Sequence, residues 1–160
     1  MILSAKTAQK KMQRMALQVA EKNAGQKALL LIGIKENGIH IANAIAGYLA
    51  SIFEGSIEVI SLELNKKMPA EITLSKEVDF NGKNILLIDD VANSGRTMMY
   101  ALKPLLTQYP AQVETLVLVE RTHKLFPVAI NYNGISVSTT MQENIIVDVS
   151  GSEIKGAYLQ

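Results

Sequence analysis

The stretch Asn84-Ile-Leu-Leu-Ile-Asp-Asp-Val-Ala-Asn-Ser-Gly-Arg-Thr97 decides the fold class. Residues 85–88 form a continuous apolar run, which is short enough for a buried strand of a parallel sheet. Asp89 and Asp90 follow where we expect this strand to leave the sheet, and after a short loop a helix can begin at Gly95. Ligands of open α/β sheets bind at the carboxyl ends of the strands. The two adjacent acids are therefore predicted to face a ligand-binding crevice.

The loop after the acids has the features of an anion site. Backbone N–H groups of residues 92–97 are predicted to point at one spot, which the N-terminus of the following helix makes electropositive. Gly95 lets the backbone approach a ligand closely, and the hydroxyls of Ser94 and Thr97 can donate to phosphate oxygens. A ligand with a vicinal diol beside a phosphate fits both halves of the stretch. The alternative is an ordinary strand-turn-helix with Ser94 as N-cap and a solvated acid pair.

Length and composition narrow the class of protein. The chain has 160 residues, 48% of them hydrophobic, which fits one domain over residues 1–160 with a sizeable core. The absence of cysteine excludes disulfides, Cys-ligated metals and thiol nucleophiles, and it fits a cytoplasmic protein. No apolar run approaches the length of a bilayer span, and the first charges follow the first apolar residues, the reverse of a signal peptide, so we expect no membrane association.

Charge is distributed unevenly along the chain. Residues 1–35 carry seven Lys and Arg side chains against Glu21 alone, while the remaining residues carry nine against fourteen acids. A basic N-terminal region could meet phosphate or RNA, and the alternative is a solvated helix face.

Apolar periodicity predicts the elements. Helices are expected over residues 5–23 and 39–53. Strands are expected over residues 28–33, 57–64 and 113–119, with short strands at Ile130 and over residues 135–138 and 145–147. Residues 65–79 are polar, contain Pro69 and receive no assignment, and Pro104 is expected to kink or restart the helix that begins at Gly95. Because strand and helix alternate through the middle of the chain, we expect an α/β fold with a largely parallel sheet.

The segment Gly33-Ile-Lys-Glu-Asn-Gly38 repeats the order of buried strand, Gly-flanked loop and helix. Its backbone amides and Lys35 could hold a second anionic group that faces the first site. The alternative is a simple strand-to-helix turn, with Gly38 entering the helix.

The signature at residues 84–97 resembles the motif by which type I phosphoribosyltransferases bind 5-phosphoribosyl-1-pyrophosphate. Two further stretches, Leu118-Val-Glu-Arg-Thr-His-Lys-Leu-Phe-Pro-Val128 and Asn133-Gly-Ile-Ser-Val-Ser-Thr139, resemble the pyrimidine-operon regulators that double as uracil phosphoribosyltransferases. The resemblance implies the type I phosphoribosyltransferase fold, a mainly parallel sheet flanked by helices, with a small hood built from the chain ends. It implies transfer of the phosphoribosyl group to a pyrimidine base, uracil, with release of pyrophosphate. It also implies Mg²⁺ carried with the substrate, and a homo-oligomer.

The resemblance assigns roles to individual residues. The candidate catalytic residues are Asp89 and Asp90, which would hold the ribose hydroxyls, and Lys35. No residue is assigned to a resident metal, and His123 has the alternative of a surface or structural histidine. The candidate substrate-binding residues are Val91, Ala92, Asn93, Ser94, Gly95, Arg96 and Thr97 for the 5-phosphate side, Glu36, Asn37 and Gly38 for pyrophosphate, and Arg121 and His123 for the base.

The chain departs from the family pattern around this predicted site. Glu36 and Asn37 stand where the regulators carry Thr-Arg, so a carboxylate replaces a hydroxyl and a cation is missing beside the pyrophosphate. Lys66 and Lys67 are the evident cations in a shortened catalytic loop. Asn93 replaces an Asp that in purine-salvage members interacts with the purine ring, which favours a pyrimidine.

The positions associated with RNA binding also differ, since Leu17, Ala129 and Ile135 replace basic or histidine residues of the regulators. Three functions stay open from the sequence. The first is the transferase, the second is a nucleotide-sensing regulator that binds RNA with weak or no catalysis, and the third is a catalytically silent subunit that keeps the nucleotide pocket.

Overall fold

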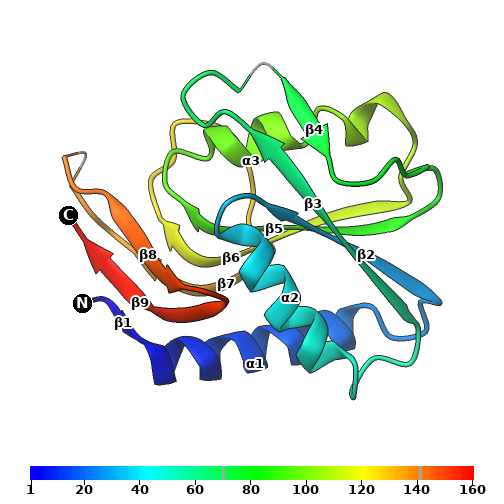
Figure 1. The fold of residues 1–160 in the computed structure, drawn as a ribbon, viewed down its shortest axis with the longest axis horizontal. Coiled ribbons are helices and arrows are strands. Elements are labelled where there is room, and N and C mark those ends of the chain that lie inside the picture. Colours follow the sequence, from blue (N-terminus) through cyan, green and yellow to red (C-terminus); the bar gives the residue numbers. More distant parts are fainter. Residues whose placement is uncertain (70, 141) are drawn as a thin grey trace.

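The main sheet of the computed structural model, which describes residues 1–69, 71–140 and 142–160, has six strands in the order β4-β3-β2-β5-β6-β7 (Figure 1). Five of the strands are parallel to one another, namely β2 (Ala28–Ile34), β3 (Ser56–Leu64), β5 (Asn84–Ala92), β6 (Gln112–Arg121) and β7 (Tyr132–Val137). The edge strand β4 (Ile72–Leu74) pairs antiparallel with β3. The predicted α/β fold with a largely parallel sheet is confirmed.

Helices cover both faces of this sheet (Figure 1). On one face α1 (Ala5–Lys22) and α2 (Gly38–Leu49) pack over a core that includes Leu86 and Ile88 of β5. On the other face lie α3 (Arg96–Ala101) and a short 3-10 helix (Leu105–Thr107), over a core that includes Ile85 and Leu87. Successive side chains of a strand point to opposite faces. The continuous apolar run therefore supplies both cores, as expected for a strand buried on both sides.

The chain ends form the hood. It is a separate three-stranded antiparallel sheet in the order β1-β9-β8, built from β1 (Leu3–Ser4), β9 (Glu153–Leu159) and β8 (Ile145–Ser150). Ser4 ends β1 and caps α1, because its Oγ accepts a hydrogen bond from the N–H of Thr7 at 3.2 Å. The hood therefore begins directly at the first helix and returns at the end of the chain beside the carboxyl ends of the main strands (Figure 1).

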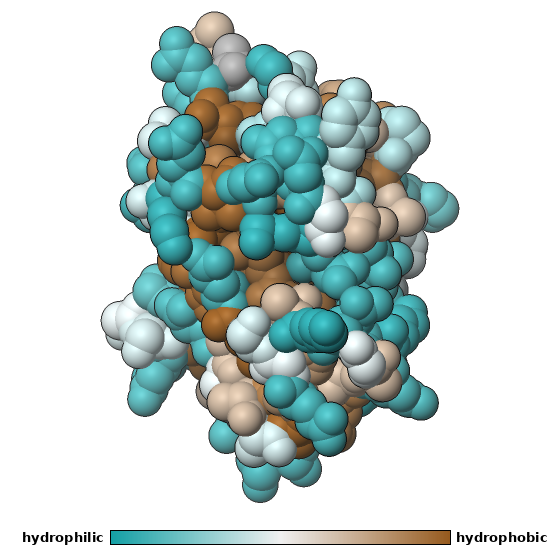
Figure 2. All heavy atoms as spheres, turned by 90° about the vertical axis from the view of Figure 1, so that its right-hand side faces the viewer, coloured by the Kyte–Doolittle hydropathy of each residue, from teal (hydrophilic) through white to brown (hydrophobic). Residues whose placement is uncertain are grey.

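The opposite end of the sheet, where the strands begin, faces the viewer in Figure 2. Apolar side chains are visible there in hollows between polar ones. Depressions of about 530 and 600 Å³ lie among the loops that precede the strands, near Lys27. Ligands of parallel sheets bind at the carboxyl ends instead. These depressions are therefore not the predicted crevice, although they are wide.

Several predicted boundaries were wrong. Strand β5 does not leave the sheet at Asp89, because its pairing with β6 continues as far as Ala92 opposite Glu120. Helix α2 ends at Leu49, whose carbonyl accepts hydrogen bonds from two following N–H groups in a closing turn, so residues 50–53 are not helical. Ile130 lies outside any strand, and β7 begins at Tyr132.

Candidate functional site

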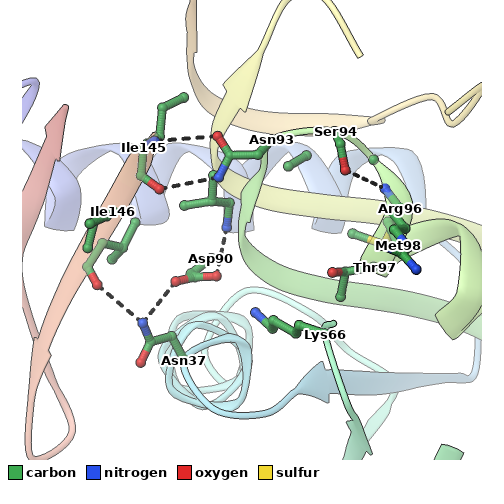
Figure 3. Close-up of a pocket in the computed structure, with 14 residues that line it drawn as sticks. Asn37, Lys66, Asp90, Asn93, Ser94, Arg96, Thr97, Met98, Ile145 and Ile146 are labelled. Carbon is green, nitrogen blue, oxygen red and sulfur yellow. Dashed lines mark hydrogen bonds between the residues drawn. The ribbon is translucent and has the colours of Figure 1, made fainter. Parts of the chain in front are cut away.

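A pocket of about 220 Å³ lies at the carboxyl end of β5, where the loop before α3, the start of α2 and the hood meet (Figure 3). Loop residues from the signature form most of its wall, and the hood closes it on one side. Its lining residues are Asn37, Lys66, Asp90, Val91, Ala92, Asn93, Ser94, Gly95, Arg96, Thr97, Met98, Ile145, Ile146 and Val147. The predicted loop residues 91–97 thus all reach one cavity.

The loop geometry suits an anion. Gly95 has φ +81°, and a Cβ added there would lie 2.8 Å from Cγ1 of Val128, so both the backbone conformation and the space require glycine. Within the described part of the chain, the N–H groups of Asn93, Ser94 and Gly95 donate to no other protein group. Unpaired N–H groups at a helix start bind phosphate or carboxylate readily. The helix N-cap is Gly95 rather than Ser94, although the Ser94 hydroxyl does accept from the N–H of Arg96 at 3.2 Å.

The two acids have different surroundings. Asp90 lines the pocket, where its Oδ1 accepts from the N–H of Val91 and its Oδ2 accepts from the side-chain amide of Asn37, both at 2.9 Å. Asp89 is 1% exposed and does not line the pocket. Its Oδ1 accepts from the N–H of Asp90 at 2.9 Å and lies 3.7 Å from Nζ of Lys66, while its Oδ2 has no hydrogen-bond partner among the described residues. The expectation that both acids face the crevice was therefore wrong for Asp89.

Burial raises the pKa of the Asp89 carboxyl well above its ordinary value, and the neighbouring charge of Asp90 raises it further. Lys66 opposes this shift but does not cancel it. Gly38 lies close against this acid, since a Cβ added at Gly38 would be only 2.9 Å from Cα of Asp89. The start of α2 thus packs directly over this acid.

Two asparagines hold the hood strand β8 against the core (Figure 3). The Asn37 amide donates to Oδ2 of Asp90 and, at 3.2 Å, to the carbonyl of Val147. Asn93 donates to the carbonyl of Ile145 at 3.3 Å and accepts from the N–H of the same residue at 3.4 Å. Both asparagines were candidates from the sequence, but their contacts with the hood were not foreseen.

The loop between β2 and α2, which was predicted as a second anion site, helps to line a neighbouring pocket of about 400 Å³. Lys35 and Glu36 line it together with Lys66 and Lys67, and neither Lys35 nor Glu36 reaches the first pocket. Lys35 also pairs with Glu63 at 3.6 Å on the surface. Asn37 and Lys66 line both cavities, so they form the wall between them. Lys66 was absent from the predicted site, although it had been recognised as a cation of the shortened loop.

The predicted base-side residues lie elsewhere. The Arg121 side chain donates to the carbonyl of Glu143, and His123 is exposed on a loop. Neither residue lines the pocket, and their placement beside the base stays a prediction. Ile145 and Ile146 of the hood form part of the pocket wall.

Comparisons with known proteins agree with this geometry. A family model described as phosphoribosyl transferase domain matches residues 1–150. The chain belongs to the phosphoribosyltransferase family. Several relatives carry the name bifunctional protein PyrR, among them the following two. The protein from Actinobacillus pleuropneumoniae serotype 5b is 30% identical over 156 residues, covering 91% of this chain and 87% of the relative. The protein from Halalkalibacterium halodurans is 34% identical over 149 residues, covering 86% and 83%.

Solved phosphoribosyltransferases share the fold. The hypoxanthine phosphoribosyltransferase of Trypanosoma cruzi superposes with a TM-score of 0.81 at 13% identity, covering 99% of this chain and 94% of that one. A hypoxanthine-guanine phosphoribosyltransferase from Bacillus anthracis gives a TM-score of 0.71 at 18% identity, covering 90% and 84%. The type I phosphoribosyltransferase fold predicted from the signature is confirmed.

Asp90 is the one carboxylate among the described residues that line this pocket. No group of three or more His, Cys, Asp or Glu side chains that could hold a metal occurs in residues 1–69, 71–140 and 142–160. Mg²⁺ prefers phosphate oxygens and water supplemented by one or two carboxylates, and Asp90 supplies one carboxylate at the pocket wall.

Across the same described ranges, no helix is long and apolar enough to cross a membrane.

Proposed function

We propose that this phosphoribosyltransferase binds 5-phosphoribosyl-1-pyrophosphate and transfers the phosphoribosyl group to uracil, releasing pyrophosphate. The observation that carries the proposal is the pairing, in one pocket, of the Asp90 carboxylate with the free N–H groups of the loop at residues 93–95. A carboxylate accepts from ribose hydroxyls, and converging N–H groups bind a phosphate. A ribose phosphate presents these two groups side by side.

In the proposed reaction the bond from the anomeric carbon to pyrophosphate breaks, and a bond from that carbon to a ring nitrogen of the base forms as the nitrogen loses its proton. Positive charge develops on the sugar and negative charge on the leaving group, so positioning and charge stabilisation supply most of the catalysis. Asp90 would hold the sugar and Thr97 would donate to the 5-phosphate. Lys66, at the wall between the two pockets, and Lys35, in the second, would face pyrophosphate, with Mg²⁺ carried on the substrate.

A pyrimidine suits this site better than a purine. The Asn93 amide nitrogen donates to the carbonyl of Ile145, and its oxygen accepts from the N–H of the same residue. An amide also cannot act as a proton acceptor toward a purine ring as the Asp of the purine-salvage members can. The relatives named PyrR and the resemblance of residues 118–128 to pyrimidine-operon regulators support the same choice. The purine enzymes among the structural neighbours are below 20% identical and bear on the fold alone.

A second candidate function is nucleotide-sensing regulation with RNA binding and weak turnover. The observation that favours it is the hydrogen bond from the Asn37 amide to Asp90, at a position where an arginine would serve pyrophosphate. The basic face of α1 gives weaker support, because Arg14 donates to the main chain of Asn133 at 2.6 Å and Lys22 stacks over the ring of Tyr132. The same contacts suit a silent subunit. For each function we expect a homo-oligomer in the cytoplasm.

The test is pyrophosphate release from 5-phosphoribosyl-1-pyrophosphate with uracil, cytosine or hypoxanthine as acceptor. The proposal expects release that depends on uracil and exceeds that with hypoxanthine, and that falls in an Asp90→Asn variant. Uridine monophosphate binding without any pyrophosphate release would favour the regulator. Loss of both binding and release in a folded protein would overturn the phosphoribosyl site itself.

A further inference from the structure

Asn37 stands between the pocket-facing acid and the hood. Its Nδ2 atom donates to Oδ2 of Asp90 at 2.9 Å and to the carbonyl of Val147 at 3.2 Å, two acceptors from parts of the chain that are 53 and 110 residues away (Figure 3). Because β8 is the edge strand of the hood, the Val147 carbonyl gains a partner here that no further strand provides. One amide group therefore links the acid to the hood.

The helix does not need this side chain. Asn37 occupies the N-cap position of α2, but it has helical dihedral angles, φ −89° and ψ −31°, and its side chain makes no capping hydrogen bond. Asparagine at an N-cap ordinarily stabilises the helix by accepting from an N–H group of the first turn. Here the amide is turned toward the pocket. The side chain consequently acts on the site and the hood rather than on the helix.

We propose that Asn37 competes with the ribose hydroxyls for Asp90, and that a ribose phosphate binds by displacing it. Both oxygens of Asp90 already accept a hydrogen bond, one from the N–H of Val91 and one from Asn37. The Asn37 side chain itself lines the pocket, so it occupies space beside the oxygen that a hydroxyl would approach. When Asn37 leaves Asp90, the hood also loses its contact at Val147. This inference rests on the proposed ribose site and adds a specificity-determining residue to it.

The competition predicts changes in Kd of different size for three ligands when Asn37 is replaced. In the wild-type protein part of the affinity that the diol supplies is offset by the broken Asn37 contact. In an Asn37→Ala variant, Kd for ribose 5-phosphate falls by about tenfold, which corresponds to about 1.4 kcal/mol. Kd for 2-deoxyribose 5-phosphate falls less, since one hydroxyl is absent. Kd for inorganic phosphate stays within about twofold, because the loop N–H groups that bind it are untouched.

The experiment is isothermal titration calorimetry of these three ligands with the wild type and Asn37→Ala. Asn43→Ala, on an exposed position of the same helix, is the matched control and is expected to bind each ligand as the wild type does. Hydrogen exchange without ligand gives an independent readout, since the amides of residues 145–150 should exchange faster in Asn37→Ala than in Asn43→Ala. Asn37→Ser keeps a small polar residue and is the second variant, should alanine impair folding.

The outcomes separate the inference from the function on which it rests. If the wild type binds ribose 5-phosphate and Asn37→Ala binds it equally or more weakly, the competition is refuted while the ribose site stands. If all three ligands gain equally, the variant has merely opened the pocket, and the competition for Asp90 is again refuted. If no folded protein binds ribose 5-phosphate, the proposed site and the competition both fail. Hydrogen exchange would then still report whether Asn37 tethers the hood.

Discussion

Replacing Asp90 should weaken nucleotide binding far more than replacing Asp89. The two acids are adjacent on β5, but only Asp90 lines the pocket, whereas Asp89 is buried beneath the start of α2. Asp90→Asn preserves the size of the side chain and removes the charge that would accept from a ribose hydroxyl. Asp89→Asn makes the same chemical change beside the pocket, so it is the matched control.

The magnitude follows from the number of charged hydrogen bonds lost. A hydrogen bond to a charged group contributes about 1.5–3 kcal/mol, so Asp90→Asn should raise Kd for uridine monophosphate by roughly 10- to 150-fold. Asp89→Asn loses no direct contact with the ligand, and its Kd should stay within about threefold of the wild type. Isothermal titration calorimetry at one fixed salt concentration measures both values, and circular dichroism verifies that each variant is folded. A larger loss for Asp89→Asn than for Asp90→Asn would refute this division of roles.

Four further outcomes follow from the same structure and sequence. Between the ordinary pKa of Asp89 and its raised value, the folded state binds more protons than the unfolded state, so the free energy of unfolding falls as pH rises. The Asp89→Asn variant lacks this titration. The melting temperature of the variant minus that of the wild type should therefore increase from pH 5 to pH 8. If this difference in melting temperature shrinks between pH 5 and pH 8, the raised pKa of Asp89 is contradicted. Gly95→Ala should destabilise the fold by about 1–3 kcal/mol in thermal denaturation, because the backbone and the space at this position require glycine. Gly47→Ala, with nothing within 4 Å of the new Cβ, should be neutral or stabilising. Equal effects of the two substitutions would show that Gly95 is not required for steric reasons. The pair Glu36→Thr and Asn37→Arg should raise kcat/KM for uracil by roughly tenfold, about 1.4 kcal/mol, by removing a carboxylate and adding a bidentate cation; a loss of activity would show that the native pair works differently. Light scattering at micromolar concentration should detect a dimer or larger assembly, and a clean monomer would count against self-association.

The elements that could be predicted from the sequence are those with a local signal. The apolar runs of β2, β5 and β6 mark strands buried on both faces, and the spacing of Met12, Met15 and Val19 marks the buried side of α1. The hood was expected from the resemblance, but in β9 two charged residues and Gly156 interrupt the apolar ones, so no periodicity revealed it. A small sheet such as the hood buries only some residues of each strand, so its hydrophobic pattern in the sequence is weaker.

The site residues that were misjudged depend on long-range packing. Side chains alternate along a strand, so adjacent acids such as Asp89 and Asp90 must diverge once pairing continues through them, and only the register of β5 with β6 reveals that it does. Arg121 is the last residue of β6 and His123 follows it, and the contacts of both side chains depend on how the next loop returns to the sheet. The contacts of Asn37 and Asn93 with the hood join residues 52 to 110 positions apart, which no local pattern can indicate.

The central claim, that the pocket at the end of β5 is a phosphoribosyl site, is tested most directly by a crystal structure with uridine monophosphate. We expect the phosphate within hydrogen-bond distance of the N–H groups of residues 93–95 and a ribose hydroxyl on Asp90, with the Asn37 amide displaced from that oxygen. A phosphate bound away from this loop, for instance beside Arg121 and His123, would contradict the account.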